Sequence, residues 1–484
     1  MRRRIFLQSS LLTSASMLLC RSGWTETVSP SPVVVDLTMD LSVQGHVIPP
    51  DFTGLSYEQT QLSNPEFFSA SNSQLVGMIS RLGRHGVLRL GGDTSEYTFW
   101  DRSAKPSGIS LKTTAGPDTG QHPIRPATIT PDAIRQLKTF LDQTGWSVIY
   151  GLNLGQGTPE RAADEAAFVM QTLGREKILA FQIGNEPDAF TLNRLRPNTW
   201  GLDDYLLEWD RFFQAVRARV PGAPFAGPDT ATHLNWLLPF ARKFQHEIKF
   251  LSSHYYAVHR PTGTIDRLLT PNERLQLEIA AFQQAEQETG LKFRMTETNS
   301  CPSGKEGVSD TFGAAIWAAD YMYQLAEAGC IGINFHGGGY GWYTPIAGNP
   351  ENGFLARPEY YGLLLLAKAG PGRLVSTKLS GTEASPHLTA YALRGLDGRL
   401  RLALFNKNVD RNAVVRIHGA NARSATVTRL TAPRLSDTTD VTLAGSVVGA
   451  DGNWTVLVEE RLSSHEGVYS VSAKRGSGVL IVFG

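Results

Sequence analysis

Cysteine is nearly absent from this chain. Its 484 residues include only Cys20, Cys301 and Cys330, which are too few for a disulfide framework. Cys301 and Cys330 fall at opposite ends of two neighbouring predicted strands. Their Cα atoms should therefore lie well beyond the roughly 7 Å that a disulfide can bridge, and we predict free thiols.

An excess of charge of one sign is absent as well, because 46 basic residues stand against 45 acidic ones, for a net charge of +1. Non-specific binding to nucleic acid or to a long polyanion depends on a basic field, so both functions are disfavoured. The eleven histidines form no H-E-x-x-H motif and no Cys/His cluster of the kind that binds zinc. We expect no metal, no other cofactor and no nucleic-acid partner.

Long apolar runs are confined to the amino terminus. Adjacent arginines and Phe-Leu in Arg2–Leu7 precede the apolar segment Leu11–Leu19, a pattern that resembles a twin-arginine export signal. The run is too short to span a membrane. We expect residues 1–28 to be an export signal and the mature chain to be a periplasmic or extracellular monomer. Acylation of Cys20 is the alternative, although Leu19 is not the small residue usual before such a cysteine.

Strand-like stretches alternate with amphipathic helical stretches between residues 46 and 369. Eight strands are predicted: Phe52–Glu58, Val87–Gly92, Ser147–Leu154, Leu179–Glu186, Ala223–Pro228, Lys249–Tyr256, Phe293–Asn299 and Cys330–Gly337. This alternation predicts an α/β fold, a (β/α)8 TIM barrel. An open doubly wound sheet is the alternative, but no glycine-rich dinucleotide turn follows the early strands.

The pattern changes at about Gly370. From there to residue 484, short strand-like runs follow one another without helices, separated by turn sequences such as Ala450–Asn453. Such a pattern predicts a β-sandwich domain over residues 370–484. The segment 29–45 precedes the barrel and contains an alternating run, Val33–Val43, that we expect to join this domain as a strand.

Two of the predicted barrel strands end in a carboxylate. The stretch Phe181–Asp188 passes from apolar residues into Gly-Asn-Glu-Pro and places Glu186 after strand four, and Phe293–Asn299 places Glu297 near the end of strand seven. Barrel enzymes hold their catalytic residues at these strand ends. Glycoside hydrolysis requires two carboxyl groups, one protonated and one ionised. Glu186 and Glu297 are therefore the catalytic candidates, against the alternative of a loop that merely contains N-E-P.

These two stretches and four others resemble glycoside hydrolase family 79 of clan A, the heparanase and β-glucuronidase family. The other four are Leu88–Asp93 (LRLGGD), Phe99–Asp101 (FWD), His254–Tyr256 (HYY) and Phe335–Tyr340 (FHGGGY). The resemblance implies a retaining glycosidase in which Glu186 is the general acid/base and Glu297 the nucleophile. It also implies a sandwich domain that is built from both ends of the chain.

The resemblance implies substrate-binding residues as well. Asn185 would bind the sugar 2-hydroxyl, and a tyrosine of the His-Tyr-Tyr stretch would donate to Glu297. Strand alternation allows only one of Tyr255 and Tyr256 to face inward, and the family's motif favours Tyr255. Three further candidates each have a structural alternative: Glu58 (sugar hydroxyls, or a solvated loop carboxylate), Arg89 (the nucleophile's field, or a barrel salt bridge) and Asp93 (the mouth of the barrel, or a helix N-cap).

In the family, the sugar's C6 carboxylate meets a tyrosine five residues after the nucleophile, glycine amides, and a tyrosine after strand eight. Gly339 and Tyr340 match the later elements, whereas Pro302 stands at the first position and has neither a hydroxyl nor an N–H. The next three residues could bind the carboxylate in place of the missing tyrosine, through a backbone amide or an ammonium group: Ser303, Gly304 and Lys305. Trp342 and Tyr343 come next to this region and either stack on a sugar ring or pack within their loop.

We therefore expect a retaining exo-β-glycosidase of the β-glucuronidase type, with a carbohydrate substrate. The balanced charge favours release of a terminal sugar from a small glycoside or an oligosaccharide end over binding of a long sulfated chain. A neutral-sugar enzyme, either a β-glucosidase or a β-xylosidase, is the first alternative. A non-catalytic carbohydrate-binding barrel is the second.

Overall fold

Eight parallel strands close into a barrel in the computed structural model, which describes residues 31–104, 126–381 and 387–484. The predicted export signal, including Cys20, lies outside the described residues. The barrel order is β2–β3–β6–β7–β8–β9–β10–β11, and β11 pairs with β2 to complete the circle. The (β/α)8 prediction is therefore confirmed, and an open sheet is excluded by this closure. The strands are β2 (Thr53–Glu58), β3 (Val87–Gly91), β6 (Ser147–Leu152), β7 (Ile178–Ile183), β8 (Phe225–Thr230), β9 (Ile248–Tyr256), β10 (Phe293–Asn299) and β11 (Ile333–Gly337).

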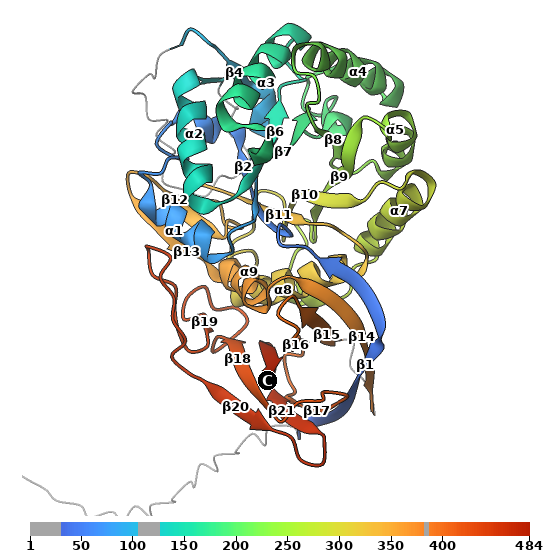
Figure 1. The fold of residues 1–484 in the computed structure, drawn as a ribbon, viewed down its shortest axis with the longest axis vertical. Helices are drawn as coiled ribbons and strands as arrows, with labels where there is room; N and C mark the ends of the chain where they lie inside the picture. The colour runs from blue at the N-terminus through green and yellow to red at the C-terminus, as the bar shows by residue number, and fades with distance from the viewer. Residues whose placement is uncertain (1–30, 105–125, 382–386) are drawn as a thin grey trace, which may run out of the picture.

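Helices surround the barrel (Figure 1). Thr130 and Thr158 are the N-caps of α2 and α3, and each side chain accepts a hydrogen bond from a backbone N–H of its helix. A proline follows each threonine at the first helical position, which is a common start signal for a helix. Gly145 ends α2 in a left-handed conformation, with φ 77°. The α-helices are α1 (Ser73–Arg81), α2 (Pro131–Thr144), α3 (Pro159–Leu173), α4 (Leu202–Arg219), α5 (Leu237–Phe244), α6 (Ile265–Leu269), α7 (Glu273–Thr289), α8 (Phe312–Glu327) and α9 (Pro358–Ala369).

The barrel interior changes from apolar to polar along its axis. A buried apolar cluster that includes Val87 and Ala180 fills one level of the barrel. Arg89 and Gln182 come two residues later on the same strands, and both are buried. Since side chains two residues apart on a strand share a face, the polar level follows the apolar one toward the carboxyl ends of the strands. The mouth of the barrel, at these carboxyl ends, is therefore lined by hydrogen-bonding groups.

Both ends of the described chain build a second sheet. Strand β1 (Val33–Ile48) pairs antiparallel with β14 and parallel with β17. Hydrogen bonds join all ten strands into one sheet rather than two separate ones, and the sheet curls over a buried core of its own that includes Leu37, Val415 and Ile481. The other strands are β14 (Gly372–Ser380), β15 (Leu388–Gly395), β16 (Leu400–Asn406), β17 (Ala413–His418), β18 (Ser424–Thr431), β19 (Thr442–Leu443), β20 (Glu460–Ser463), β21 (Tyr469–Ala473) and β22 (Ser477–Phe483).

Two short ribbons complete the described strands. Strands β4 (Thr98–Trp100) and β5 (Ala127–Ile129) pair in parallel, and β12 (Ile346–Asn349) and β13 (Gly353–Ala356) pair antiparallel. A 3-10 helix, η2 (Asp93–Tyr97), follows β3, and another, η4 (Pro187–Ala189), follows β7. The loops that carry η2 and η4 contribute Asp93, Asn185 and Glu186 to the site described below.

Helices α8 and α9 lie between the barrel and the sheet domain (Figure 1). Asp320 of α8 accepts hydrogen bonds from Thr389 (2.6 Å) and Tyr391 (2.8 Å) of β15. It also forms an ion pair with the Lys407 ammonium at 2.7 Å, and both side chains are buried. The Tyr323 and Tyr391 rings stack beside this group with centroids 5.0 Å apart. A buried polar cluster therefore joins the two domains.

Cys301 and Cys330 are free and buried, which confirms the prediction for these two residues. Burial raises the pKa of each thiol to about 11. A thiol with such a pKa is almost entirely protonated at neutral pH, and it is therefore a poor nucleophile.

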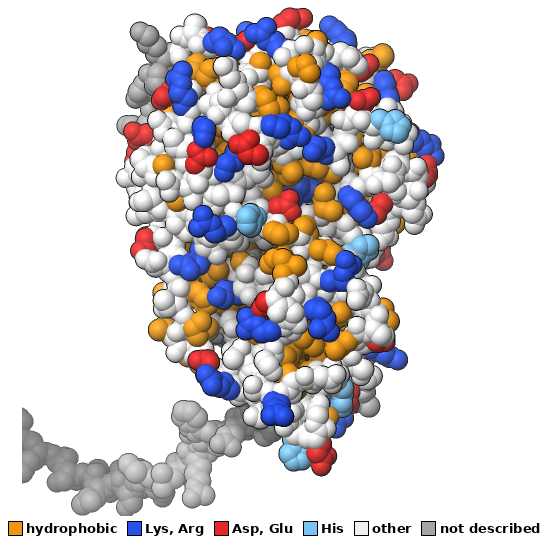
Figure 2. Space-filling view, in the orientation of Figure 1, with side chains coloured by type: hydrophobic (Ala, Val, Ile, Leu, Met, Phe, Trp, Pro, Cys, Tyr) orange, Lys and Arg blue, Asp and Glu red, His pale blue; other side chains and the backbone are white. Residues whose placement is uncertain are grey.

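The surface carries charges of both signs. Basic and acidic side chains are interspersed over the face that Figure 2 shows, in keeping with the net charge of +1. None of the described helices combines the length and the apolar character that crossing a bilayer requires. The viewed face therefore offers no broad basic field for a polyanion.

Candidate active site

Glu186 and Glu297 meet at the mouth of the barrel. Glu186 follows β7 and Glu297 lies in β10, with β8 and β9 between these strands. One carboxylate oxygen of each residue and one ring nitrogen of His254 all lie within 4.8 Å of one another. Two catalytic carboxyl groups stand about 5–5.5 Å apart where one attacks the sugar directly, and about 6.5–9.5 Å apart where a water molecule lies between. The observed separation therefore fits direct attack.

Glu297 is held in its ionised form. Its Oε2 accepts from Arg89 Nη1 at 2.7 Å and its Oε1 accepts from the Tyr256 hydroxyl at 2.6 Å. Burial raises the pKa of this carboxyl, but the hydrogen bond from Tyr256 and three neighbouring cations lower it more, to about 2; the cations are His336, His254 and Arg89. An ionised carboxylate at neutral pH has the charge that a nucleophile needs.

Glu186 is shifted in the opposite direction. Burial raises its pKa, and the negative charge of Glu297 adds to the increase, while a hydrogen bond from His254 opposes it. The residue has a left-handed backbone, with φ 50° and ψ 53°, and its amide donates to the Asp229 carbonyl at 3.0 Å. Two neighbouring carboxyl groups with opposed pKa shifts are the arrangement of an acid and a nucleophile.

Arg89 connects most of the site. Its Nη2 donates to Asn185 Oδ1 at 2.7 Å and to Asp229 Oδ2 at 2.6 Å, and its Nε donates to Gln182 Oε1 at 3.0 Å. Burial lowers the pKa of this guanidinium, but Asp229 and Glu297 raise it further above its ordinary value. The two interpretations of Arg89 are therefore both correct, since its contact with Glu297 lies within a buried barrel salt bridge.

Asp229 belongs to this network although the sequence reasoning missed it. Its carboxylate bonds to Arg89, to Gln182 Nε2 (2.6 Å), to His254 Nε2 (3.1 Å) and to the Thr296 hydroxyl. Burial raises its pKa, but Arg89 and His254 outweigh burial and hold the pKa well below its usual range. The available signal was its position directly after the predicted strand Ala223–Pro228, at another strand end of the barrel.

Tyr256, and not Tyr255, donates to Glu297, so the preference for Tyr255 was wrong. The Tyr255 ring is buried and stacks on Tyr321 of α8, with centroids 5.4 Å apart. His254 faces the barrel interior, and Tyr256, two residues later, must share that face. The spacing H-x-Y within the stretch was the signal that selects Tyr256.

Three more of the predicted residues line the mouth. Glu58 Oε2 accepts from the Thr94 amide (2.9 Å) and hydroxyl (2.6 Å), and its Oε1 lies 3.3 Å from His336 Nε2. Asn185 Nδ2 donates to Asp93 Oδ1 at 3.4 Å. Glu58 is therefore a bonded residue of the site, not a solvated loop carboxylate.

Asp93 is the first residue of η2, and the N-cap of this helix is Gly92, so the N-cap alternative does not hold. Its side chain is open to solvent yet lies in an enclosed setting. Burial and the charges of Glu186, Glu58 and Glu297 raise its pKa well above the usual value. Asp93 therefore offers an accessible acidic group beside Asn185.

The turn after β10 holds the residues expected to meet the sugar carboxylate, and two of their donor groups already form hydrogen bonds within the protein. Ser303 and Gly304 have left-handed backbones, with φ 54° and 67°, and the Gly304 amide donates to a carbonyl of the same turn at 3.0 Å. The Lys305 ammonium donates to the Gly263 carbonyl at 2.7 Å. The Gly304 amide is therefore engaged within the turn, whereas the Lys305 ammonium ties the turn to the loop after β9.

The loop after β11 approaches the residues around Glu297 through Tyr343. Its ring centroid lies 5.8 Å from that of His336 and 6.5 Å from that of Tyr256. The carbonyls of Gly339 and Tyr340 accept bonds from the Gly348 amide (2.8 Å) and from Arg357 (3.2 Å), respectively. These two residues are thus fixed within the loop, and Tyr343 is the one that borders the network around Glu297.

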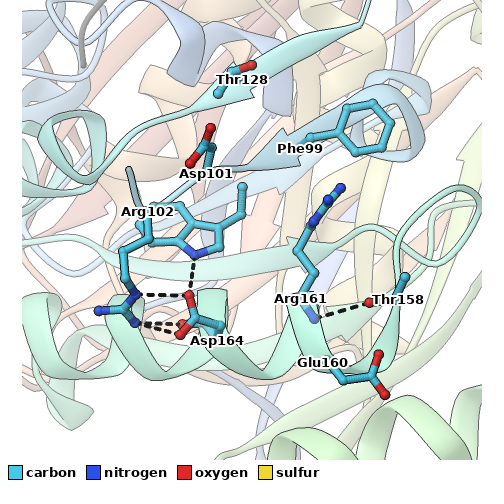
Figure 3. A pocket seen from close by; sticks show the side chains of 9 residues that line it. Phe99, Asp101, Arg102, Thr128, Thr158, Glu160, Arg161 and Asp164 are labelled. Carbon is cyan, nitrogen blue, oxygen red and sulfur yellow. Dashed lines mark hydrogen bonds and ion pairs between the residues drawn. The ribbon is translucent and has the colours of Figure 1, made fainter. Parts of the chain in front are cut away.

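A cavity of about 620 Å³ lies at the ends of β4 and α3. Trp100 Nε1 donates to Asp164 Oδ2 at 2.8 Å, and Figure 3 shows Arg102 bonded to the same carboxylate. Arg161 lies over the Phe99 ring at 5.6 Å. None of the residues that line this cavity belongs to the carboxylate pair. The contacts of Trp100 with Asp164 and of Phe99 with Arg161 hold β4 against α3.

The cluster of Glu186, His254 and Glu297 also meets the spacing of a metal site, but its chemistry does not fit one. Both ring nitrogens of His254 face carboxylates, at 2.8 Å from Glu186 and 3.1 Å from Asp229. Burial lowers the pKa of His254, but Asp229 and Glu297 raise it well above its usual range. A metal binds neutral imidazole, whereas this ring favours the protonated form beside the Arg89 cation.

A comparison with models of known protein families gives no match. Two curated proteins that are similar in sequence are both named β-glucuronidase. The Neurospora crassa protein is 24% identical over 424 residues, covering 78% of this chain and 73% of that protein. The Aspergillus niger protein is 24% identical over 393 residues, covering 74% and 69%.

Solved structures share the fold. A 4-O-α-L-rhamnosyl-β-D-glucuronidase from Fusarium oxysporum matches with a TM-score of 0.75 and 17% identity, over 93% of this chain and 100% of that one. An α-L-arabinofuranosidase from Thermotoga maritima matches with a TM-score of 0.64 and 16% identity, over 93% and 99%. At these identities the likeness establishes the architecture, a TIM barrel with an attached β-sheet domain.

Proposed function

We propose that this chain is a retaining β-glucuronidase, a glycoside hydrolase that releases terminal glucuronic acid from glycosides or oligosaccharide ends. The observation that carries the proposal is the pair of Glu186 and Glu297, whose oxygens lie within 4.8 Å and whose pKa values shift in opposite directions. The glucuronic acid specificity rests on the two relatives named β-glucuronidase. Six sequence stretches support membership of glycoside hydrolase family 79.

The proposed reaction is a double displacement. Glu297 attacks the anomeric carbon while Glu186 protonates the leaving oxygen, and a glycosyl ester forms on Glu297. Water then attacks the ester with Glu186 as the base, which restores the original anomeric configuration. Asn185, which accepts from Arg89 at 2.7 Å, would bind the sugar 2-hydroxyl.

A neutral-sugar β-glycosidase is the second candidate. Pro302 stands where the family has a tyrosine for the sugar carboxylate, and the Gly304 amide and Lys305 ammonium already bond within the protein. A β-glucoside or β-xyloside lacks that carboxylate and would need no such partner.

Hydrolysis of a panel of nitrophenyl β-glycosides tests the proposal. We expect turnover of the glucuronide and much slower turnover of the glucoside and xyloside, with the β-anomer of the sugar released first as seen by NMR. Turnover of only the neutral glycosides would establish the second candidate. Sugar binding without turnover would indicate a non-catalytic barrel, and an α-anomer as first product would exclude retention.

We also propose that residues 1–28 direct export by the twin-arginine route and that the mature protein acts as a monomer outside the cytoplasm. The paired arginines and the short apolar segment support export. Replacing Arg3 and Arg4 by lysine should leave the protein in the cytoplasm, as cell fractionation would show. Light scattering on the purified mature chain would test the monomer.

A further inference from the structure

His254 stands between the two halves of the proposed chemistry. Its Nδ1 lies 2.8 Å from Glu186 Oε1 and 3.9 Å from Glu297 Oε1, and its Nε2 lies 3.1 Å from Asp229 Oδ2. The side chain is fully buried. The ring therefore bonds directly to the acid/base while it is held from the other side by a carboxylate.

This contact creates a conflict for the acid step. A permanent imidazolium 2.8 Å from Glu186 would stabilise the ionised form of Glu186, yet the acid step needs the protonated form. The conflict disappears if the proton moves along the hydrogen bond between Nδ1 and Oε1. Both ends of that bond are titratable, and water has little access to the buried ring.

We propose that His254 stores the proton that Glu186 delivers to the leaving group, so that the two residues share one proton in the resting enzyme. This inference rests on the proposed glycosidase function and adds a residue that acts through Glu186. Asp229 supports the storage, since its carboxylate holds the Nε2 proton and favours the charged ring.

The charge on Glu297 controls the transfer. As Glu297 bonds to the anomeric carbon, the bond from that carbon to the leaving oxygen breaks, and the leaving oxygen takes the proton of Glu186. That proton reaches Glu186 from His254 Nδ1, so the leaving group departs with the one shared proton, His254 becomes neutral and Glu186 is left ionised. The new ester on Glu297 carries no charge, so the anion 3.9 Å from Nδ1 no longer favours the imidazolium.

The second half-reaction returns the proton. Water attacks the anomeric carbon, the ester bond breaks, and Glu297 leaves as a carboxylate. Glu186 takes a proton from the attacking water and passes it to His254 Nδ1, while the hydroxyl stays on the sugar. One water molecule is consumed in the cycle, and every protein group ends in its starting state.

The proposal predicts which group limits activity at high pH. Ionisable groups face His254 from every element that packs around it: Glu186 after β7, Asp229 on β8, Arg89 on β3, Glu297 on β10, Asp93 in η2 and Glu278 on α7. Asp229 and Glu297 raise the pKa of His254 despite burial. Loss of the stored proton should therefore set a basic limb above the usual titration range of histidine.

The test is the pH profile of kcat/KM for His254→Asn. Asparagine keeps a hydrogen bond to Glu186 but cannot store a proton, so the basic limb should fall to the pKa of Glu186 alone. We expect a downward shift of about one to two pH units, with activity approaching that of the wild type at the acidic end of the profile. His418→Asn is the matched control, because His418 Nε2 pairs with Asp36 at 2.8 Å in the sheet domain, and its profile should not move.

Asp229→Asn is the second variant, because it removes the largest charge that raises the pKa of His254 and should lower the same limb. A uniform loss of rate at all pH values in both variants, with the limb unmoved, would reduce His254 to a positioning residue and overturn the inference. In that case an active wild-type protein would leave the proposed glycosidase function intact. A wild-type protein that cleaves none of the β-glycosides would overturn both.

Discussion

At the scale of single residues, hydrogen bonds to charged groups decide the protonation of the site. Tyr256 and Arg89 each bond a different oxygen of Glu297, at 2.6 and 2.7 Å. Bonds of this charge-assisted kind are worth roughly 1.5–3 kcal/mol each. Single substitutions that remove one bond should therefore have measurable effects on both rate and pH dependence.

Tyr256→Phe removes the hydroxyl that donates to ionised Glu297. Since the bond favours the charged form, its loss should raise the pKa of Glu297 from about 2, and the acidic limb of kcat/KM should move to higher pH. We expect kcat/KM to fall about 10- to 100-fold. Tyr255→Phe is the matched control, because that ring packs on Tyr321, and equal losses in the two variants would contradict the assignment.

Glu186→Ala removes the group that protonates the leaving oxygen. Poor leaving groups depend on that proton, so their kcat/KM should fall by about 10²- to 10⁴-fold. Dinitrophenyl glycosides should lose far less, because their leaving oxygen needs little protonation. Steady-state rates across a series of aryl glucuronides would measure this, and an equal loss for all of them would remove Glu186 from the acid role.

Glu297→Gln provides the complementary case. The amide cannot form the glycosyl ester, so turnover should be lost for all leaving groups alike. Substrate binding should persist, since Glu58, Asn185 and Asp93 remain in place. Calorimetric titration of the variant with a glucuronide would separate lost chemistry from lost binding, and turnover at a wild-type rate would exclude Glu297 as the nucleophile.

At the scale of elements, loops from different strands hold one another in position. Glu96 of η2 accepts from the Asn185 amide after β7 at 2.6 Å and from the Gly155 amide after β6. Arg196 then bonds the carbonyls of Leu154 and Gly155, at 3.0 and 2.7 Å. Asn185 directly precedes Glu186, so Glu96 helps to position Glu186 through the backbone.

Glu96→Gln should reveal a pH-dependent term in stability. Burial raises the pKa of Glu96 to about 7, although the amides that donate to it act in the opposite direction. Between pH 4.5, the ordinary pKa of a glutamic acid, and about 7, the folded state thus binds a proton more tightly than the unfolded chain does. The free energy of unfolding should therefore fall as pH rises through that window.

Denaturant unfolding of the wild type and of Glu96→Gln across this pH range would measure the difference. The variant lacks the titrating group, so the gap between the two curves should change with pH by about 1–3 kcal/mol. Its kcat should also fall, because an amide cannot accept from both backbone N–H groups. A gap that is constant with pH would show that Glu96 does not titrate there.

At the scale of the whole molecule, the sheet domain braces the barrel through a buried ion pair. The Lys407 and Asp320 side chains are 5% and 4% exposed. Lys407→Met should leave Asp320 with two hydroxyl donors and the Gln324 amide but no cation, at a cost of about 3–5 kcal/mol. Lys138→Met, which breaks an exposed pair with Asp142, should have little effect.

Thermal unfolding of both variants would check this expectation. A large loss for Lys407→Met, together with separate transitions for the two domains, would identify the pair as a link between them. Equal stability of the two variants would mean that the hydroxyl groups of Thr389 and Tyr391 satisfy Asp320 without the lysine.

Local patterns in the sequence were sufficient to predict the barrel and the carboxylate pair. The alternation of strands and helices, and the carboxylate at the end of strands four and seven, depend on residues that are close together in the chain. For the same reason the preference for Tyr255 over Tyr256 was avoidable. The two-residue spacing from His254 selects the inward face without any tertiary information.

The sequence alone determined the barrel, the carboxylates at the ends of strands four and seven, and the free thiols of Cys301 and Cys330, because short-range periodicity specifies where strands lie and end. Only the tertiary structure decided the network of Asp229, His254 and Glu96. Those residues come from separate strands and loops, and no spacing along the chain encodes which of them meet. Closure of the barrel brings them within hydrogen-bonding distance, and burial there sets which carboxyl group keeps its proton.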